Sequence, residues 1–458
     1  MKICERALFA QVMNRKGDVR PCAWAGFYTL GNLKENTLAE IYHSDAAKRF
    51  QQSLIDGTYD FCNSEECPYM ANNELEQHII EVDELPEYPQ WLSLSYDNRC
   101  NYNCTCCVAR SNQGIDPEVE NKIEEGIRDA LPHIQWLNAN GQGEFFASPG
   151  IMKLVSEWKP ENIENAEFCL ESNGSLFTPQ NWEKIKNLAF ANLSVVITVH
   201  SFEEAAYQYL SGTKIKISQI EENLRFIHKL REEGKVNTFI ITTVMQERNF
   251  RTLPQFIERC LNEFKADQVR IRRFLPERAM DENIEWFFDI RNPLHPYHQE
   301  YLDVMKHPIF KDPRLFIWTG DKLSMRGELP AKANYCVLKD LFFIENVGEK
   351  LSDYLKGKGY DRIALYALSD IAKALIKIME GQSVKIAYIY DRNSKLTEWN
   401  GCEVRKPINR NLVKTKEPLL VTLIARHGEM EEFLRQHEYA GEILCLEKIL
   451  YEIKKEQC

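Results

Sequence analysis

The feature that most constrains the fold is an alternation of short apolar runs and longer amphipathic segments between Trp91 and Phe274. The short runs are rich in β-branched and aromatic residues, which favour strands, and the longer segments, such as Ser218 to Arg231, have helical spacing. Six strands are expected, at Trp91 to Tyr96, Ile134 to Asn138, Glu167 to Glu171, Leu193 to Val199, Val236 to Met245 and Gln268 to Arg273. Strands that alternate with helices form a parallel sheet, curled or open, with the active site at the carboxyl ends of the strands.

A group of closely spaced cysteines follows the first expected strand. Cys100, Cys104 and Cys107 are spaced C-x3-C-x2-C, and Cys106 lies between the last two. A cluster of four irons normally takes four thiolates, so three thiolates from one loop leave one iron open to a small molecule. From the residues alone, a zinc site is the alternative, although no second Cys or His pair at zinc spacing follows within about a hundred residues.

This cysteine loop resembles that of the radical SAM superfamily, both in its spacing and in its place after the first strand. The resemblance implies an α/β fold with a partial (β/α)6 TIM-like barrel and a [4Fe-4S] cluster held by Cys100, Cys104 and Cys107. It also implies that S-adenosylmethionine (SAM) binds the open iron and is cleaved by one electron to a 5'-deoxyadenosyl radical. Cys106 stands where the family usually has an aromatic residue; Cys107 is favoured as the ligand because only that choice keeps the family spacing.

Two short motifs and a histidine at the ends of later strands fit the same family. The candidates for cofactor binding are Gly141, Gly143, Glu144, Ser172, Asn173 and His200. The Gly-x-Gly-Glu segment is similar to the family's glycine-glutamate motif, which implies a carboxylate that meets the ammonium group of SAM. The Ser-Asn-Gly segment is similar to a turn near the adenosine, although either motif by itself is often only a turn. The histidine is expected to line the ribose or substrate pocket, or else to be a buried structural side chain.

The first 80 residues hold a second set of cysteines. Cys4, Gly17 and Cys22 fit C-x12-G-x4-C, and Cys62 and Cys67 follow at C-x4-C spacing. The segment resembles the SPASM and twitch modules of radical SAM enzymes, which implies that the four cysteines bind an auxiliary [4Fe-4S] cluster. Thiolates favour iron-sulfur or zinc over hard metals, and zinc is the alternative. The module precedes the barrel here, whereas in that family it follows the barrel.

The rest of the chain is expected to form further domains, because 458 residues exceed what one hydrophobic core usually supports. The expected division is 1–80 for the auxiliary module, 88–280 for the barrel, 281–340 for an unassigned connector and 341–458 for a Rossmann-like α/β domain. In the last domain Ala367, Ser369 and Ala372 stand where three glycines would bind a dinucleotide, and Asp391 stands near the place of a ribose-binding acid. We expect a weakened or lost nucleotide site, or a domain for docking or homodimer formation.

Composition excludes some partners. A net charge of -11 argues against a nucleic-acid backbone or an anionic membrane as the main partner, because both require a basic face. The sequence shows neither a signal peptide nor a run of about 18 apolar residues, so we expect a cytoplasmic protein. Fourteen cysteines in that reducing compartment indicate metal binding or redox chemistry rather than disulfides.

The leading hypothesis is a radical SAM enzyme, reduced by flavodoxin or ferredoxin, that abstracts hydrogen from a substrate C–H bond. The SPASM resemblance favours a peptide or protein substrate, whereas the Rossmann-like domain favours a sugar or nucleotide-linked carbohydrate. A hypothesis from another class is an iron-sulfur electron-transfer or scaffold protein. The Gly143-Glu144 and Ser172-Asn173 positions argue against it, because an electron carrier does not need them.

Overall fold

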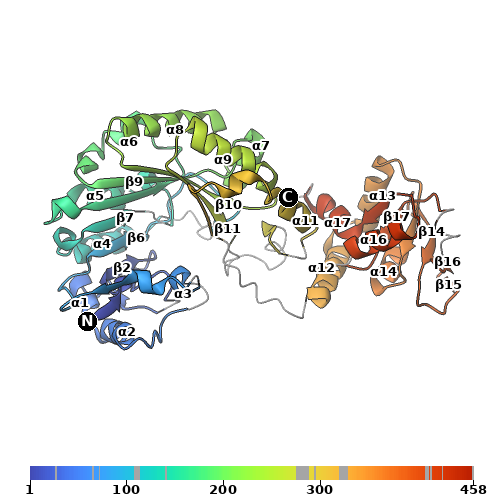
Figure 1. The fold of residues 1–458 in the computed structure, drawn as a ribbon, viewed down its shortest axis with the longest axis horizontal. Coiled ribbons are helices and arrows are strands. Elements are labelled where there is room, and N and C mark those ends of the chain that lie inside the picture. The colour runs from blue at the N-terminus through green and yellow to red at the C-terminus, as the bar shows by residue number, and fades with distance from the viewer. Residues whose placement is uncertain are drawn as a thin grey trace. The chain divides into compact units, whose positions relative to one another are not determined.

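The computed structural model describes residues 1–25, 28–63, 67–71, 73–107, 114–139, 142–274, 288–292, 295–318, 329–407, 412, 415–424 and 427–455. The chain forms two compact units (Figure 1). The first comprises Met1–Asp281 and Asp303–Lys322, and the second comprises Glu282–Leu302 and Leu323–Cys458. Within the described residues, no helix is both long and apolar enough to cross a membrane.

A curled parallel sheet forms the body of the first unit. Its strands are β6 (Trp91–Leu94), β7 (Trp136–Ala139), β8 (Glu167–Ser172), β9 (Asn192–Thr198), β10 (Thr238–Met245), β11 (Gln268–Arg273) and β12 (Leu315–Trp318). They are hydrogen-bonded in chain order, each parallel to the next. The predicted partial TIM-like barrel is therefore confirmed. Part of the expected connector belongs to this unit, because β12 extends the sheet beyond β11.

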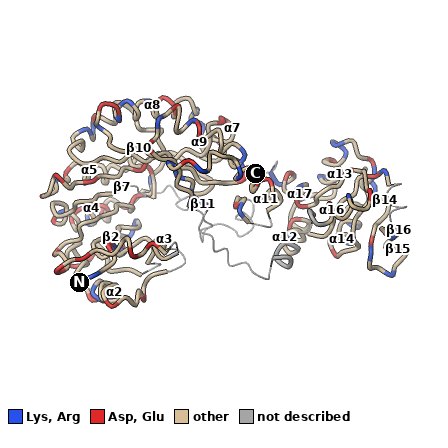
Figure 2. The backbone as a smooth tube through the Cα atoms, viewed as in Figure 1, with Lys and Arg blue, Asp and Glu red and all other residues tan. Residues whose placement is uncertain are grey.

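Helices cover the outer face of this sheet (Figure 1). They are α4 (Pro117–Arg128), α5 (Pro149–Glu157), α6 (Pro179–Trp182), α7 (Glu204–Ser211), α8 (Ile217–Glu232) and α9 (Leu253–Glu258). The outward side chains of the strands, such as Leu92, Leu137 and Phe168, are almost completely buried beneath them. Both basic and acidic side chains lie along α8, so the helix does not carry charge of a single sign (Figure 2).

The amino-terminal module adds three strands to the barrel sheet and also forms a separate two-stranded sheet. Its strand β2 (Phe9–Val12) is parallel to β6, and β3 (Asp18–Arg20) and β4 (Gly31–Asn32) follow in antiparallel order. A second pair, β1 (Lys2–Cys4) and β5 (Ile79–Glu81), is antiparallel. Its helices are α1 (Leu38–Tyr42), α2 (Asp45–Ile55) and α3 (Pro68–Ala71). Helix α1 begins at a capping box formed by Thr37 and Glu40.

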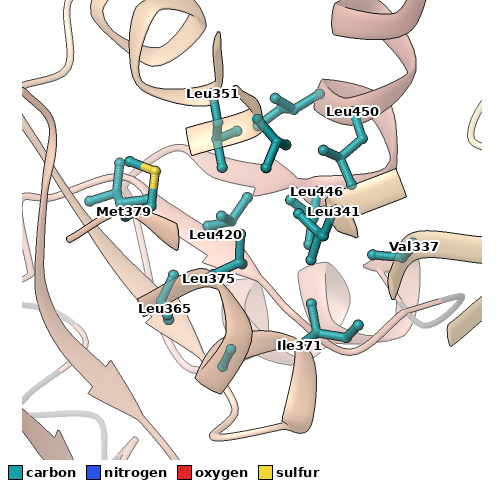
Figure 3. Packing of buried hydrophobic residues seen from close by; sticks show 14 of the residues in the cluster. Val337, Leu341, Leu351, Leu365, Ile371, Leu375, Met379, Leu420, Leu446 and Leu450 are labelled. Carbon is teal, nitrogen blue, oxygen red and sulfur yellow. The ribbon is translucent and has the colours of Figure 1, made fainter. Parts of the chain in front are cut away.

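The second unit is a smaller α/β domain. Its sheet has the order β15 (Glu398–Trp399), β16 (Cys402–Arg405), β14 (Lys385–Tyr390), β13 (Arg362–Tyr366), β17 (Leu419–Val421) and β18 (Ile443–Cys445), parallel except for β15. Its helices are α12 (Leu329–Phe343), α13 (Val347–Gly357), α14 (Asp370–Ile378), α16 (His427–Gln436) and α17 (Leu446–Lys455). Figure 3 shows leucines from helices and strands, including Leu351, Leu365, Leu420 and Leu450, that meet in one core. The parallel strands lie on both sides of the first strand, β13, as in doubly wound sheets.

Candidate iron-sulfur and cofactor site

The cysteine loop begins at the carboxyl end of β6, where a buried ion-pair network holds it. The Asp97 carboxylate is fully buried and accepts hydrogen bonds from the backbone N–H and Nε of Arg99 at 2.9 and 2.7 Å. Arg99 Nη2 also donates to Glu120 of α4 at 2.6 Å. Such charge-assisted bonds fix the loop just before its first cysteine.

The middle of the loop is held by α7. The backbone N–H groups of Asn103 and Thr105 donate to the carbonyls of Ser211 and Leu210, at 3.1 and 2.9 Å. The helix ends at Gly212, whose φ is +58° and whose added Cβ would lie 2.1 Å from the Asn103 carbonyl oxygen. Only glycine allows both this backbone conformation and this close approach.

The structure brings the thiols of the loop together. Burial raises the pKa of Cys100 to about 11, and burial raises the pKa of Cys104 well above its usual range. The charges of Cys106, Cys107 and Cys100 raise the pKa of Cys104 further, so these sulfur atoms are near one another. Without a metal the raised pKa values of Cys100 and Cys104 keep both thiols protonated at neutral pH, and a metal cluster would supply the positive charge that stabilises thiolates.

Cys106 faces His200 at the end of β9. Cys106 Sγ lies 3.8 Å from His200 Nε2. Burial lowers the pKa of His200 to about 4, so the imidazole is neutral at pH 7. The structure therefore places the predicted residue His200 at the cysteine loop, next to the cysteine that departs from the family pattern.

The glycine-glutamate motif packs directly against the cysteine loop. An added Cβ at Gly143 would lie 2.2 Å from the carbonyl oxygen of Arg99, which explains the glycine. The backbone N–H of Glu144 donates to the same carbonyl at 2.8 Å. The Glu144 side chain is fully buried, and burial raises its pKa. Gly141 lies outside the described residues.

Glu144 connects this motif to the turn after β8. Its carboxylate accepts from Ser172 Oγ at 2.7 Å and from the backbone N–H of Asn173 at 2.8 Å. Asn173 Nδ2 in turn donates to Asn101 Oδ1 at 2.9 Å and lies 3.8 Å from Cys100 Sγ. Three predicted cofactor residues, Glu144, Ser172 and Asn173, thus form one hydrogen-bonded network with the first predicted cluster ligand, Cys100. Their contacts with SAM stay a prediction.

The donor set at this loop fits an iron-sulfur cluster. The backbone N–H of Tyr102 lies 3.4 Å from Cys100 Sγ, so two N–H groups point at a sulfur that would carry negative charge as a ligand. Among the described residues, no three His, Cys, Asp or Glu side chains converge on a point for one metal ion. A cubane binds each thiolate to a different iron, so its ligands do not need to meet at one point.

The four amino-terminal cysteines surround one cavity. Cys4, Cys22, Cys62 and Cys67 line it together with aromatic and apolar side chains from α2 and the loops, including Trp24, Phe50, Leu54 and Tyr59. Burial raises the pKa of Cys4 to about 11 and the pKa of Cys62 to about 12, and the neighbouring cysteines contribute to both shifts. All four predicted auxiliary ligands are therefore brought together.

Arg6 shows that this cavity suits a negatively charged group. Its side chain lines the same cavity, and Nη2 donates to the Tyr69 hydroxyl at 2.9 Å. Its guanidinium lies 5.1 Å from the Phe9 ring centroid and 5.8 Å from that of Trp91. Arg6 Nε is buried and has no hydrogen-bond partner among the described residues. A buried cation is stabilised by nearby anions: the Glu5 carboxylate is one, and a cluster with four thiolates would add net negative charge.

The turn after β13 in the second unit is held by the carboxylate of Asp391, and Ala367 and Asp391 line a cavity there. Ala367 has a φ of +76°, an unusual conformation for alanine. Asp391 accepts hydrogen bonds from the backbone N–H groups of Leu368, Asn393 and Ser394. The carboxylate expected near a ribose thus holds the turn, and nucleotide binding by this domain stays a prediction.

Two family matches cover the regions just described. Residues 94–260 match the Radical SAM superfamily, and residues 4–68 match the SPASM iron-sulfur cluster-binding domain. The chain is therefore an iron-sulfur enzyme built on a partial α/β barrel. It belongs to the radical SAM superfamily and carries its SPASM domain ahead of the barrel. Its cofactors are a [4Fe-4S] cluster and SAM, and the SPASM domain binds a further iron-sulfur cluster.

One protein sequence and two crystal structures are similar to this chain over part of their length. An uncharacterized protein of Methanocaldococcus jannaschii is 24% identical over 247 residues, which are 51% of this chain and 80% of that protein. Two crystal structures of SuiB from Streptococcus suis, one bound to S-adenosylmethionine, align at 13% and 14% identity with TM-scores of 0.36 and 0.35. They cover 67% of this chain and 70% and 69% of theirs.

Sequence reasoning missed the residues that hold the two sites in place. Asp97 and Arg99 brace the cysteine loop, the hydroxyl groups of Tyr102 and Tyr207 are hydrogen-bonded beneath it, and Arg6 lies in the amino-terminal cavity. The Asp-x-Arg spacing next to the first cysteine was a usable local signal for the first two. The others depend on contacts between distant segments, which no local pattern reveals.

Proposed function

We propose that this radical SAM enzyme abstracts hydrogen from an unactivated C–H bond of a peptide or protein. The observation that carries the proposal is the shared network of Cys100, Asn173 and Glu144 at the carboxyl ends of the barrel strands. When bound, the cluster and SAM supply a 5'-deoxyadenosyl radical. The SPASM domain supports a peptide substrate over a small metabolite, and reduced flavodoxin or ferredoxin is the proposed electron donor.

The residues of the chain have distinct roles in this proposal. Cys100, Cys104 and Cys107 hold three irons, and Asn173 orients Cys100 through its N–H···S contact. Glu144 keeps the turn after β8 against the cysteine loop, through its bonds to Ser172 and Asn173.

The test compares SAM cleavage by matched cysteine variants. Protein is purified and reconstituted without oxygen, then incubated with SAM and dithionite, and 5'-deoxyadenosine is measured by liquid chromatography. We expect Cys104→Ala to lower its formation by at least about 1000-fold, because the cluster loses a ligand. Cys402→Ala, in the second unit, is the matched control and retains wild-type rates. Undiminished cleavage by Cys104→Ala would refute the site.

The substrate class is tested separately. Wild-type enzyme is incubated with a peptide fraction and with a mixture of nucleotide sugars, and mass changes of 1 or 2 hydrogens are followed. Deuterium transfer from a labelled peptide into 5'-deoxyadenosine is the expected result. Transfer only from a labelled sugar would overturn the peptide assignment and leave the radical chemistry intact.

A further inference from the structure

Two strands present charged side chains to the inner face of the barrel. On β11, Val269 and Ile271 are buried against the outer helices, whereas Arg270 and Arg272 alternate with them and are half-buried. On β8, Leu170 is buried on the outer side and Glu171 follows it. Because side chains alternate along a strand, both arginines and Glu171 face the interior.

These side chains approach one another across the interior. β9 and β10 lie between β8 and β11, so the two backbones are about 14 Å apart along the sheet. Even so, Arg272 Nη2 lies only 4.0 Å from Glu171 Oε2. Arg270 interacts electrostatically with Glu171 and with Cys169, two residues earlier on β8. The curl of the sheet therefore places a charged cluster on its concave side.

The cluster has more positive than negative charge. Arg270 Nε donates to the neutral amide oxygen of Gln268 at 2.6 Å. Glu171 is the one carboxylate near the two guanidinium groups among the residues that the structure describes, and it is beyond hydrogen-bond distance. Burial and the charge of Arg272 both lower the pKa of Arg270. Two guanidinium groups that share one carboxylate leave a net positive charge that an anion would balance.

This cluster is adjacent to the cofactor network. Glu171 directly precedes Ser172, whose hydroxyl donates to Glu144. The next residue, Asn173, contacts Cys100 Sγ. A substrate group bound by the arginines would therefore lie beside the edge of the sheet where SAM is expected.

We infer that Arg270 and Arg272 bind a carboxylate of the substrate, so that the enzyme acts on an acidic peptide. The inference rests on the proposed function and adds its substrate class. Guanidinium groups bind carboxylates through paired N–H donors, which fixes orientation as well as affinity. Glu171 competes with that carboxylate for Arg272 and limits its affinity.

The test measures equilibrium binding to reconstituted enzyme with SAM, without turnover. The probes are two acetylated, amidated pentapeptides, Gly-Gly-Glu-Gly-Gly and Gly-Gly-Gln-Gly-Gly, and UDP-glucose, each followed by ligand-observed NMR. We expect the Glu peptide to bind at least tenfold more tightly than the Gln peptide. Arg270→Gln with Arg272→Gln should weaken the Glu peptide by roughly 10- to 100-fold. Arg225→Gln, a surface ion-pair residue of α8, is the matched control and leaves its affinity unchanged.

A gain-of-binding variant guards against misfolding. Glu171→Gln removes the competing carboxylate, and we expect it to strengthen binding of the Glu peptide several-fold. Equal affinity for the two peptides, or the same affinity in wild type and the double Arg variant, overturns the inference. If the double Arg variant loses binding of UDP-glucose alone, the inference is also overturned, because the two arginines would then bind a phosphate and not a carboxylate. The proposed function fails on different evidence, namely absent 5'-deoxyadenosine in the wild type.

Discussion

The stability of the buried Arg6 cation depends on the charge of the group that the amino-terminal cavity holds. With neutral thiols around it, a buried guanidinium with an unpaired Nε is unfavourable. With thiolates around it, the cation is stabilised, and the negative charge of Cys22 raises the Arg6 pKa although burial lowers it. The residue therefore couples the charge of the bound cluster to the stability of the module.

This coupling predicts a shift in reduction potential. Arg6→Met removes a positive charge beside the auxiliary cluster, so adding an electron to the cluster becomes less favourable. We expect the midpoint potential to fall by tens of millivolts, on the order of what a charge at the edge of a buried site contributes. Potentiometric titration followed by EPR measures it, and Arg6→Lys, which keeps the charge, is the control. A potential that is the same in Arg6→Met and wild type would contradict the role of the guanidinium.

At the scale of elements, the turn after β7 and the cysteine loop depend on one backbone contact. An added methyl at Gly143 would collide with the Arg99 carbonyl oxygen, and backbone cannot move aside cheaply. We expect Gly143→Ala to displace the loop and lose about half of the bound iron, with the auxiliary cluster kept. Gly357→Ala, where nothing lies within 4 Å of the added Cβ, is the matched control and keeps its iron. Iron and sulfide assays of the two variants test this prediction. A wild-type iron content in Gly143→Ala would show that the close approach of Gly143 to Arg99 is not needed to bind the cluster.

The elements also show how far sequence patterns reach. The expected strand Gln268 to Arg273 is β11 to the residue, and β8, β9 and β10 differ from their expected bounds by one or two residues. The periodicity of apolar residues and the preference of residue types for strands are properties of a short segment, so they predict such strands well. The pairing of β2 with β6 was not predicted, because it joins segments about 80 residues apart. The alternation of side chains along β11 predicts that Arg270 and Arg272 point to the inner face of the barrel. Their closeness to Glu171 could not be predicted in this way, because it depends on the curl of the sheet.

At the scale of the whole first unit, Cys22 and Cys100 lie near opposite ends of the paired strands β2 and β6. Arg20 of β3 pairs with Gln11 of β2, so Cys22, two residues later, is level with Phe9 at the amino end of β2. Cys100 follows the carboxyl end of β6, which is parallel to β2. Four-residue strands separate the edges by about 10 Å, and the loops add to this distance. The auxiliary ligands therefore lie away from the carboxyl edge, where SAM and substrate are expected.

This separation predicts that the two clusters assemble independently. Cys62→Ala with Cys67→Ala should lose the auxiliary cluster, about four of roughly eight irons, because two [4Fe-4S] clusters are expected in the wild type. The remaining cluster should still change its EPR spectrum when SAM is added, since the loop of Cys100 is held by β6, α4 and α7 rather than by the amino-terminal cavity. Cys100→Ala with Cys104→Ala and Cys107→Ala should keep the other four irons and show no response to SAM. Loss of all iron in either variant would contradict this prediction. It would mean that loss of one cluster disrupts the other site through the sheet shared by β2 and β6, so that the two sites form one cooperative unit.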